Sequence, residues 1–362
     1  MLPLKWRRVR QFMTVPVTPD ISRVSPYMTH ATPTTACRVR PARGASKALV
    51  LGSGLLITLA TLAWPLFHTK SADAQPELAA TTYPITLGRQ GEKAGEFQQP
   101  RGVTFLRDGS FVVVDRAARV QHFTADAKPL SLWSMKDHAM GNPKGLCALP
   151  DGNMLVCDTH YGRVLKMTPD GALLAVWGQP GKGPGQFVHP MGAAVDAARN
   201  RVFVVEYGDY TDRVQVFDLD GKWQKAFGSC GLKDGEFQRP SGITLDKDGN
   251  VFVADACNHR IQKFNGGGAW LKSFGKEGSA DGELRYPYDI AFGADGLLYV
   301  AEFANHRVSV FDCEGRFVRR FGEPGHGAGQ FASPWSIAAD ATGHVVVSDT
   351  GNHRLKIFEI QK

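Results

Sequence analysis

The sequence lacks the helical spacing of hydrophobic residues from residue 83 onward. Short apolar runs separated by glycine-rich turns occur there instead, which favours β-strands over helices. Cysteine is also scarce. There are six in 362 residues, and their spacing fits no zinc-binding pattern. The glycines of this part form no phosphate-binding cradle, because no predicted helix follows them.

Residues 75–362 have no basic excess, although the whole chain has a net charge of +7. Residues 1–74 hold ten of the 42 basic residues and two of the 35 acidic ones, which gives them +8. The remaining 32 basic and 33 acidic residues leave the rest of the chain at −1. A nearly neutral domain lacks the electrostatic footprint of a nucleic-acid-binding protein, so we expect no nucleic-acid partner.

An internal repeat organises the chain from residue 83 to its end. Each copy opens with a proline, and the prolines are Pro100, Pro143, Pro190, Pro240, Pro287 and Pro334. The steps between them are 43, 47, 50, 47 and 47 residues. A nearly fixed period of this length indicates a repeat architecture. A glycine and an aromatic residue precede several of the prolines, as in 235–237, and predict a turn with an anchoring aromatic side chain.

One repeat predicts four strands. In the copy from 240 onward, apolar runs at 243–245 and 251–254 flank the hairpin turn signal Asp248-Gly249. Alternating runs follow at 260–264 and 270–274. Four strands per repeat form a propeller blade, and residues 83–362 have room for six. The fold class is therefore an all-β six-bladed β-propeller. The last copy is one strand short, so we expect residues 83–88 to supply its outer strand and close the ring.

Three copies carry the motif Asn-His-Arg, at 258–260, 305–307 and 352–354. With this motif and the blade pattern, the chain resembles the NHL-repeat family across 83–362. The resemblance implies a six-bladed propeller of bacterial type, membrane-anchored or secreted. The first three copies depart from the motif, with Ala-Ala-Arg at 117–119, Tyr-Gly-Arg at 161–163 and Thr-Asp-Arg at 211–213.

Every copy pairs an acid with an arginine. Because the pair occurs once per blade rather than at one special place, we interpret it as structural, bridging strands and satisfying loop backbone groups. The Asn-His residues receive the same interpretation. The predicted pairs are Asp115 with Arg119, Asp158 with Arg163, Glu206 with Arg213, Asp255 with Arg260, Glu302 with Arg307 and Asp349 with Arg354.

The N-terminal part has a different composition. Residues 1–47 form a basic leader predicted to be disordered, 48–67 an uncharged apolar stretch long enough to span a bilayer, and 68–82 a linker. Basic residues cluster before the apolar stretch, which places the propeller outside the cytoplasm. The protein is then anchored in the membrane through 48–67. The alternative is secretion after signal-peptidase cleavage following Ala74.

Five cysteines lie in the propeller: Cys147, Cys157, Cys230, Cys257 and Cys313. In an oxidising compartment a disulfide can form. We predict one between Cys230 and Cys257, which lie in loops on the same face of the fourth blade. The alternative is that the cysteines are buried thiols in strands.

A second resemblance bears on enzymatic activity. The chain is distantly similar to the peptidyl-hydroxyglycine amidating lyase propellers, which place zinc-binding histidines directly after the blade-opening prolines. No histidine stands at these positions here, so we expect no metal site of that kind, and no cofactor. The residues after the six prolines are Arg101, Lys144, Met191, Ser241, Tyr288 and Trp335.

Those six positions form a ring at the mouth of the central channel, where propellers tend to bind ligands. Arg101, Lys144, Tyr288 and Trp335 belong to neighbouring blades and form one arc that predicts a site for a ligand with an apolar face and an anionic group. Met191 and Ser241 lie on the far side. The sequence therefore predicts a monomeric binding or scaffold module for a protein partner or a small ligand. The alternative is an enzyme, a lyase or hydrolase, with its site at the same mouth.

Overall fold

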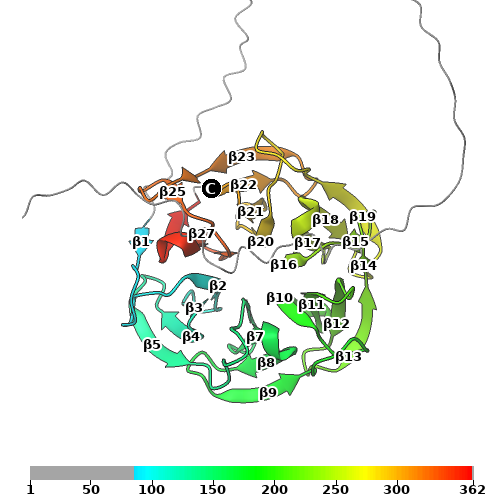
Figure 1. Cartoon of the computed structure of the whole chain (residues 1–362), viewed down its shortest axis with the longest axis horizontal. Coiled ribbons are helices and arrows are strands. Elements are labelled where there is room, and N and C mark those ends of the chain that lie inside the picture. The colour runs from blue at the N-terminus through cyan, green and yellow to red at the C-terminus, as the bar shows by residue number, and fades with distance from the viewer. Residues whose placement is uncertain (1–84, 361–362) are drawn as a thin grey trace, which may run out of the picture. The chain divides into compact units, whose positions relative to one another are not determined.

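The computed structural model describes residues 85–360, and the predicted regions 1–47, 48–67 and 68–82 lie outside them. Six four-stranded antiparallel sheets surround a central channel, as Figure 1 shows. Each sheet runs from an inner strand at the channel to an outer strand at the rim. This arrangement confirms the predicted all-β six-bladed propeller. Among residues 85–360, no helix is long and apolar enough to cross a membrane.

The blades follow the predicted order along the chain. The strands of the first three are β2 (Pro100–Phe105), β3 (Phe111–Asp115), β4 (Arg119–Phe123) and β5 (Pro129–Ser134); β6 (Gly145–Ala148), β7 (Met154–Asp158), β8 (Arg163–Met167) and β9 (Leu173–Trp177); and β10 (His189–Asp196), β11 (Arg201–Tyr207), β12 (Arg213–Phe217) and β13 (Trp223–Phe227).

Blades four to six repeat the pattern. Their strands are β16 (Pro240–Leu245), β17 (Val251–Asp255), β18 (Arg260–Phe264) and β19 (Trp270–Phe274); β20 (Pro287–Phe292), β21 (Leu298–Glu302), β22 (Arg307–Phe311) and β23 (Phe317–Phe321); and β26 (Ile337–Ala339), β27 (His344–Asp349), β28 (Arg354–Glu359) and β1 (Ile85–Leu87).

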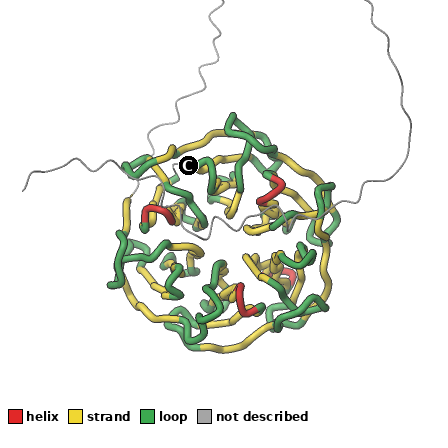
Figure 2. Tube along the Cα trace, in the orientation of Figure 1, coloured by secondary structure: helices red, strands yellow, loops and turns green. Residues whose placement is uncertain are grey.

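Short elements complete the fold. Two-residue strands lie at the rim before blades four and six: β14 (Ser229–Cys230) with β15 (Glu236–Phe237), and β24 (Glu323–Pro324) with β25 (Gln330–Phe331). The helices coloured in Figure 2 are single 3₁₀ turns: η2 (Thr159–Tyr161), η3 (Ala197–Arg199), η4 (Ala256–Asn258) and η5 (Thr350–Asn352). Three of them, η2, η4 and η5, connect the second and third strands of a blade.

The N-terminal strand closes the ring. Strand β1 pairs with β28 in antiparallel register, with Ile85 opposite Ile357 and Leu87 opposite Leu355. The fully buried Lys356 side chain donates through Nζ to Thr86 Oγ1 at 3.0 Å and to Ala328 O at 2.7 Å. A buried ammonium group is stable only when its donors are satisfied, so these bonds help to fix the closing strand. The predicted closure is confirmed over Ile85–Leu87.

The core consists of apolar layers between neighbouring blades. The second strands are buried along their whole length, as β3, β7, β17 and β21 show. Strands with both faces covered read as continuous apolar runs, which explains why these segments do not alternate. Rings such as Phe187 and Phe217, whose centroids are 5.5 Å apart, fill the space between blades. The inner strands thereby receive a rigid support, and their first residues are held around the channel mouth.

Candidate functional site

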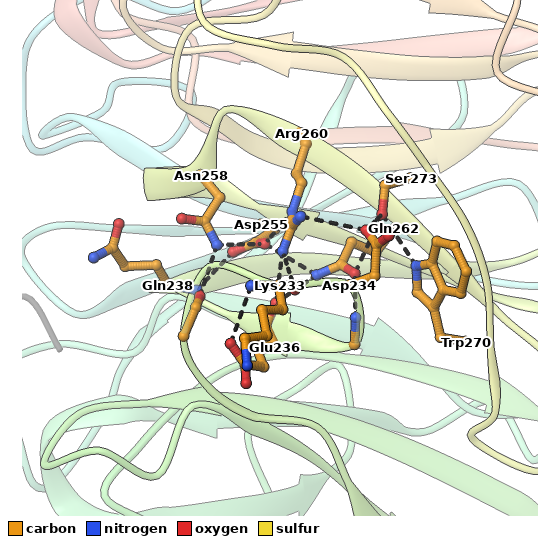
Figure 3. Close-up of polar contacts among 12 residues, drawn as sticks. Lys233, Asp234, Glu236, Gln238, Asp255, Asn258, Arg260, Gln262, Trp270 and Ser273 are labelled. Atoms are coloured by element: carbon orange, nitrogen blue, oxygen red, sulfur yellow. Dashed lines mark hydrogen bonds and ion pairs between the residues drawn. The ribbon is translucent and has the colours of Figure 1, made fainter. Parts of the chain in front are cut away.

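The acid–arginine pairs form a repeated polar frame near the outer loops. All six predicted pairs are ion pairs with N–O distances of 2.5–2.8 Å. In blade four, drawn in Figure 3, Asp255 accepts from Arg260 at 2.8 Å and from the backbone N–H of Gln238 at 2.7 Å. Arg260 also donates to the carbonyls of Lys233 and Glu236. The pair therefore holds the loop that enters the blade.

The Asn-His residues link loops and blades. The asparagines of this motif donate to the acid of their own blade; Asn258, for example, donates to Asp255 at 2.8 Å. The histidines adopt the left-handed conformation with φ of 53–55°. Their Nδ1 atoms accept N–H groups of the next blade, from Tyr286 to His259, from Ser333 to His306 and from Gln99 to His353, at 2.9–3.2 Å. Only a neutral imidazole can accept in this way.

The predicted disulfide between Cys230 and Cys257 is wrong, because Cys257 carries a free thiol. Cys230 lies on β14 at the rim, where it pairs with Phe237 of β15 (Figure 1). Cys257 lies in η4, and burial raises the pKa of its thiol while the nearby Arg239 lowers it. The Cys257 thiol thus faces the channel side of the blade. Strand pairing holds Cys230 at the rim. The turn pattern in the sequence indicates on which face of the blade each cysteine lies, but not how far it lies from the channel.

The channel itself contains a cavity of about 320 Å³, lined by the inner strands of all six blades. This volume lies at the lower end of the range found for small-molecule pockets. Five of the six ring residues line it: Lys144, Met191, Ser241, Tyr288 and Trp335. Deeper in the channel, Asp289 accepts from Ser336 Oγ and the Ile337 N–H, and burial raises its pKa to about 6.

The structure brings the four predicted binding residues together at the mouth. The guanidinium carbon of Arg101 lies 4.6 Å from the centre of the Trp335 ring, and Lys144 Nζ lies 5.9 Å from it. The Tyr288 ring packs edge-on against Trp335 at 4.7 Å. Cations over aromatic faces are mutually stabilised, so the four side chains form one arc rather than separate rim residues.

Three further residues complete the cluster. Phe303 stacks on Tyr288 at 4.7 Å, Arg239 lies 5.0 Å from the Tyr207 ring, and Lys144 Nζ lies 5.9 Å from that ring. Tyr207 and Phe303 both follow the acid of their blade, and Arg239 precedes a blade-opening proline. Each of these positions recurs in every repeat. The residue types at these positions stand out in the sequence when the repeats are aligned, but the sequence does not show that these positions reach the mouth.

We name this set the mouth cluster: Arg101, Lys144, Tyr207, Arg239, Tyr288, Phe303 and Trp335.

Two of the three cations of the mouth cluster, Arg101 and Lys144, are poorly compensated. Among residues 85–360, no carboxylate forms an ion pair with Arg101, Lys144 or Arg239. Burial, followed by the charge of Arg116, lowers the pKa of Arg101 to about 10, and burial also lowers the pKa of Lys144. Arg101 Nε is buried without a hydrogen-bond partner. Buried cations without counter-charges are unfavourable, and an anion would relieve that cost.

The mouth also affects its neighbours. Burial would raise the pKa of Tyr207, but Lys144 and Arg239 beside its hydroxyl lower it overall. Burial, followed by the charge of Lys144, lowers the pKa of His160 to about 4, and the same two causes lower that of His189. Both histidines are therefore neutral at physiological pH. The mouth then carries positive charge mainly from Arg101, Lys144 and Arg239. Within residues 85–360, no group of three His, Cys, Asp or Glu side chains is placed to hold a metal ion.

Comparisons with known proteins identify NHL repeats in part of this propeller. The NHL repeat model matches residues 237–264, 284–311 and 331–358, which are the central parts of blades four, five and six. Human NHL repeat-containing protein 3 is 31% identical over 121 residues, which are 32% of this chain and 33% of that protein. The match therefore spans about a third of the relative's length.

Two solved structures show the same fold at low identity. A catalytically inactive virginiamycin B lyase from Staphylococcus aureus, solved with quinupristin, has a TM-score of 0.53 and 14% identity over 77% of this chain and 96% of that one. A chain of a nidogen/laminin complex has a TM-score of 0.56 and 17% identity, over 70% of this chain and 97% of that one. Residues 85–360 are therefore a six-bladed β-propeller in which blades four to six are NHL repeats.

Proposed function

We propose that this propeller is a binding module that holds an anionic group of a partner protein or small ligand at the mouth cluster. One observation carries the proposal: the buried Lys144, the half-buried Arg101 and the exposed Arg239 converge on aromatic rings, and no carboxylate within residues 85–360 forms an ion pair with them. A carboxylate between Arg101 and Lys144 would accept charge-assisted hydrogen bonds, including one from the unpartnered Arg101 Nε. The rings of Tyr288 and Trp335 would cover an apolar or sugar face.

The place of the module in the cell is part of the same proposal. The uncharged stretch 48–67 and the basic residues before it support a membrane anchor with the propeller outside the cytoplasm. Cleavage after Ala74 would release the same propeller as a secreted protein. The nearly neutral charge of residues 75–362 favours protein or small-molecule ligands over nucleic acids. We propose that the protein acts as a monomer, because β1 gives the last blade the same four strands as the other five and completes the ring within one chain.

The proposal is tested with the full-length protein by isothermal titration calorimetry against carboxylates, sugar acids and acidic peptides. The replacement of both Arg101 and Lys144 by Ala should weaken binding of any anionic hit at least about tenfold, since a hydrogen bond to a charged group contributes about 1.5–3 kcal/mol. Ser241→Ala, on the far side of the same ring, is the matched control and should bind as the unmodified protein does. Equal affinities in the double variant and the control would refute the site.

An enzyme with its site at this mouth is the second candidate, and Tyr207 is the observation in its favour. The charges of Lys144 and Arg239 lower the pKa of its phenol, which is the direction that helps a phenolate act as a base. The virginiamycin B lyase fold shows that a propeller of this shape can serve an enzyme. Tyr207→Phe separates the candidates. In a binding module it leaves product formation absent and ligand affinity nearly unchanged, whereas in an enzyme it lowers turnover more than affinity.

A further inference from the structure

Five of the six blade junctions are filled by a loop of this chain. Each loop leaves an outer strand, inserts one large apolar side chain between the two blades and continues to the next blade-opening proline. We call these side chains the anchor residues, and all are at most 1% exposed: Phe97, Phe187, Phe237, Leu284 and Phe331. Each forms a parallel bridge with a residue seven positions earlier, as Phe97 does with Gln90.

Side chains of the following blade hold each loop. The arginine of the ion pair donates to loop carbonyls; Arg213, for example, donates to Gly183 O and Gln186 O at 3.0 and 3.1 Å. The acid accepts the N–H two residues before the proline in all five cases, at 2.7–3.0 Å. In blades one, three and four, a glutamine two residues after the arginine both accepts from and donates to the loop backbone.

The junction between blades one and two lacks this loop. The step from Pro100 to Pro143 is 43 residues, the shortest of the five. Among the described residues no parallel bridge occurs there, and the only buried apolar side chain between β5 and Pro143 is Met135, which directly follows β5. Arg163 donates to the exposed carboxylate of Asp137 at 2.8 Å instead of to loop carbonyls. The N–H of Gly141, two residues before the proline, donates to His138 O rather than to the acid.

Two consequences are visible in blade two. Asp158 is fully buried, and its Oδ1 has no hydrogen-bond partner, whereas in blades three to six the acid oxygen that does not bind the arginine accepts the loop N–H. A buried carboxylate oxygen without a donor is unfavourable, because it has lost its bonds to water and gained none in the protein. Leu165 stands where three other blades have the loop-binding glutamine. Blade two therefore retains Arg163 and Asp158, the residue types that bind the loop backbone in the other blades. In place of the glutamine it has the apolar side chain of Leu165.

A cavity of about 370 Å³ opens at this junction. Its apolar wall comes from Trp133, Met135, Leu165 and Met167, and Arg163 lies at its polar side. Met167 is equivalent to Phe123 and Phe217, the residues that contact the anchor residues of their junctions. Leu173 lines the cavity, and further exposed apolar side chains lie on the outer strands β5 and β9 of the two blades: Leu130, Leu132, Leu174 and Val176. A rim of this kind is typical of a protein-interaction site.

We propose that the junction between blades one and two binds an extended segment of a partner protein that presents a large apolar, preferably aromatic, side chain beside a glycine. The side chain fills the cavity against Leu165 and Met167, as the anchor residues fill the other junctions. The segment's carbonyls accept from Arg163, and one of its N–H groups satisfies Asp158 Oδ1. This site is separate from the mouth cluster and does not depend on the proposed function.

The chemistry favours a peptide over other occupants. A lipid chain or small apolar molecule would fill the cavity but would leave Asp158 Oδ1 without a donor. An extended backbone offers alternating N–H and C=O groups, which are the groups that Asp255 and Arg260 bind in blade four. The five loops of this chain therefore define what the sixth junction recognises.

The test uses one of those loops as the probe. A fluorescein-labelled peptide with the sequence of residues 231–240, GLKDGEFQRP, is titrated with the full-length protein and followed by fluorescence anisotropy. We expect saturable binding. The same peptide with alanine in place of its phenylalanine should bind at least about tenfold more weakly, because the buried aromatic side chain dominates the contact. These two titrations use only the unmodified protein and do not depend on any variant folding.

Variants of the protein test whether the peptide binds at the junction between blades one and two. Met167→Trp fills the cavity and should abolish peptide binding without lowering Tm. Arg163→Lys should weaken binding, whereas its matched control, Arg260→Lys, acts on a loop that is already in place and should lower Tm without changing peptide affinity. Equal binding of the two peptides, absence of saturable binding, or loss of binding only when Arg101 and Lys144 are replaced would overturn the proposal. The last outcome would instead place the peptide at the mouth cluster.

Discussion

Blade four and blade two contain the same acid–arginine pair, but the pair has different neighbours in the two blades. In blade four, Asp255 and Arg260 bind three backbone groups of the incoming loop, and the anchor residue Phe237 closes the junction. In blade two, Asp158 and Arg163 bind each other at 2.8 Å without any such group. The pair is therefore retained where its loop is missing, so its presence alone does not show that a junction is filled.

The largest effect is expected when the acid of blade four is removed, because the incoming loop fills the junction there. Asp255→Ala leaves the buried end of Arg260 without its partner and frees the Gln238 N–H, and we expect a loss of about 3–5 kcal/mol in the free energy of unfolding. Asp158→Ala should lose less, about 1–2 kcal/mol, because Arg163 keeps Asp137 and no loop N–H is freed. Urea denaturation measures both. Equal losses would contradict the difference between the blades.

A loop transplant should make the junction between blades one and two like the other five junctions. Replacing residues 135–142 by the loop Glu323–Ser333, which carries the anchor residue Phe331, should fill the junction between blades one and two. Burial of a phenylalanine side chain contributes about 1.5–3 kcal/mol, so we expect a higher Tm in thermal unfolding and no remaining affinity for the 231–240 peptide. The same transplant with alanine in place of the phenylalanine is the control. A Tm that does not rise in the first variant would show that the junction is already complete.

At the channel mouth, we compare how replacing a cation and replacing an apolar residue of the same ring change stability. Lys144 is buried and faces Arg101 and Arg239 without a carboxylate, so Lys144→Met should stabilise the ligand-free protein by about 1 kcal/mol. Met191, at the equivalent position in blade three, already has an apolar side chain, and Met191→Leu should leave stability nearly unchanged. Chemical denaturation without ligand compares the two. Destabilisation by Lys144→Met would show that the lysine serves the fold.

The smallest effect concerns the part of the pH dependence of stability that comes from the Asn-His residues of blades four and five. Burial lowers the pKa of His259 and His306 below the ordinary value of 6.5. The unfolded chain therefore binds protons first as the pH falls, and stability should decrease from about pH 6.5 downward until the folded histidines are also protonated. The double variant His259→Asn, His306→Asn should flatten this dependence in unfolding experiments between pH 4 and 8. His326→Asn, at an exposed position, should not change it.

Part of the molecule follows from local sequence signals. The turn at Asp248-Gly249, with φ of 81° at Gly249, requires a residue that tolerates the left-handed region, and such turns together with the continuous apolar runs predict the strands. Repetition at a near-fixed step then predicts six blades, because one blade cannot bury both its faces alone. The missing fourth strand of the last repeat predicts that residues 83–88 close the ring, and the pairing is found over Ile85–Leu87.

The arc of Arg101, Lys144, Tyr288 and Trp335 was also predictable, because equivalent positions in a closed ring face the same mouth. The contribution of Tyr207 and Arg239 came only with the tertiary structure, since they occupy other repeat positions and reach the mouth through the conformation of their loops. The Cys230–Cys257 prediction failed for the same reason: two residues on the same face of a blade can lie at different distances from the central channel.

What only the tertiary structure decided is which polar groups are satisfied. The sequence shows an acid and an arginine in all six blades, and a shorter step between Pro100 and Pro143. Whether the shorter loop still supplies an anchor residue and an N–H for Asp158 depends on how the chain bends between β5 and β6, because hydrogen bonds and cavities arise from distances of a few ångströms between segments. Repeat period and residue type determined the ring, and contacts across the blade junctions determined where it remains incomplete.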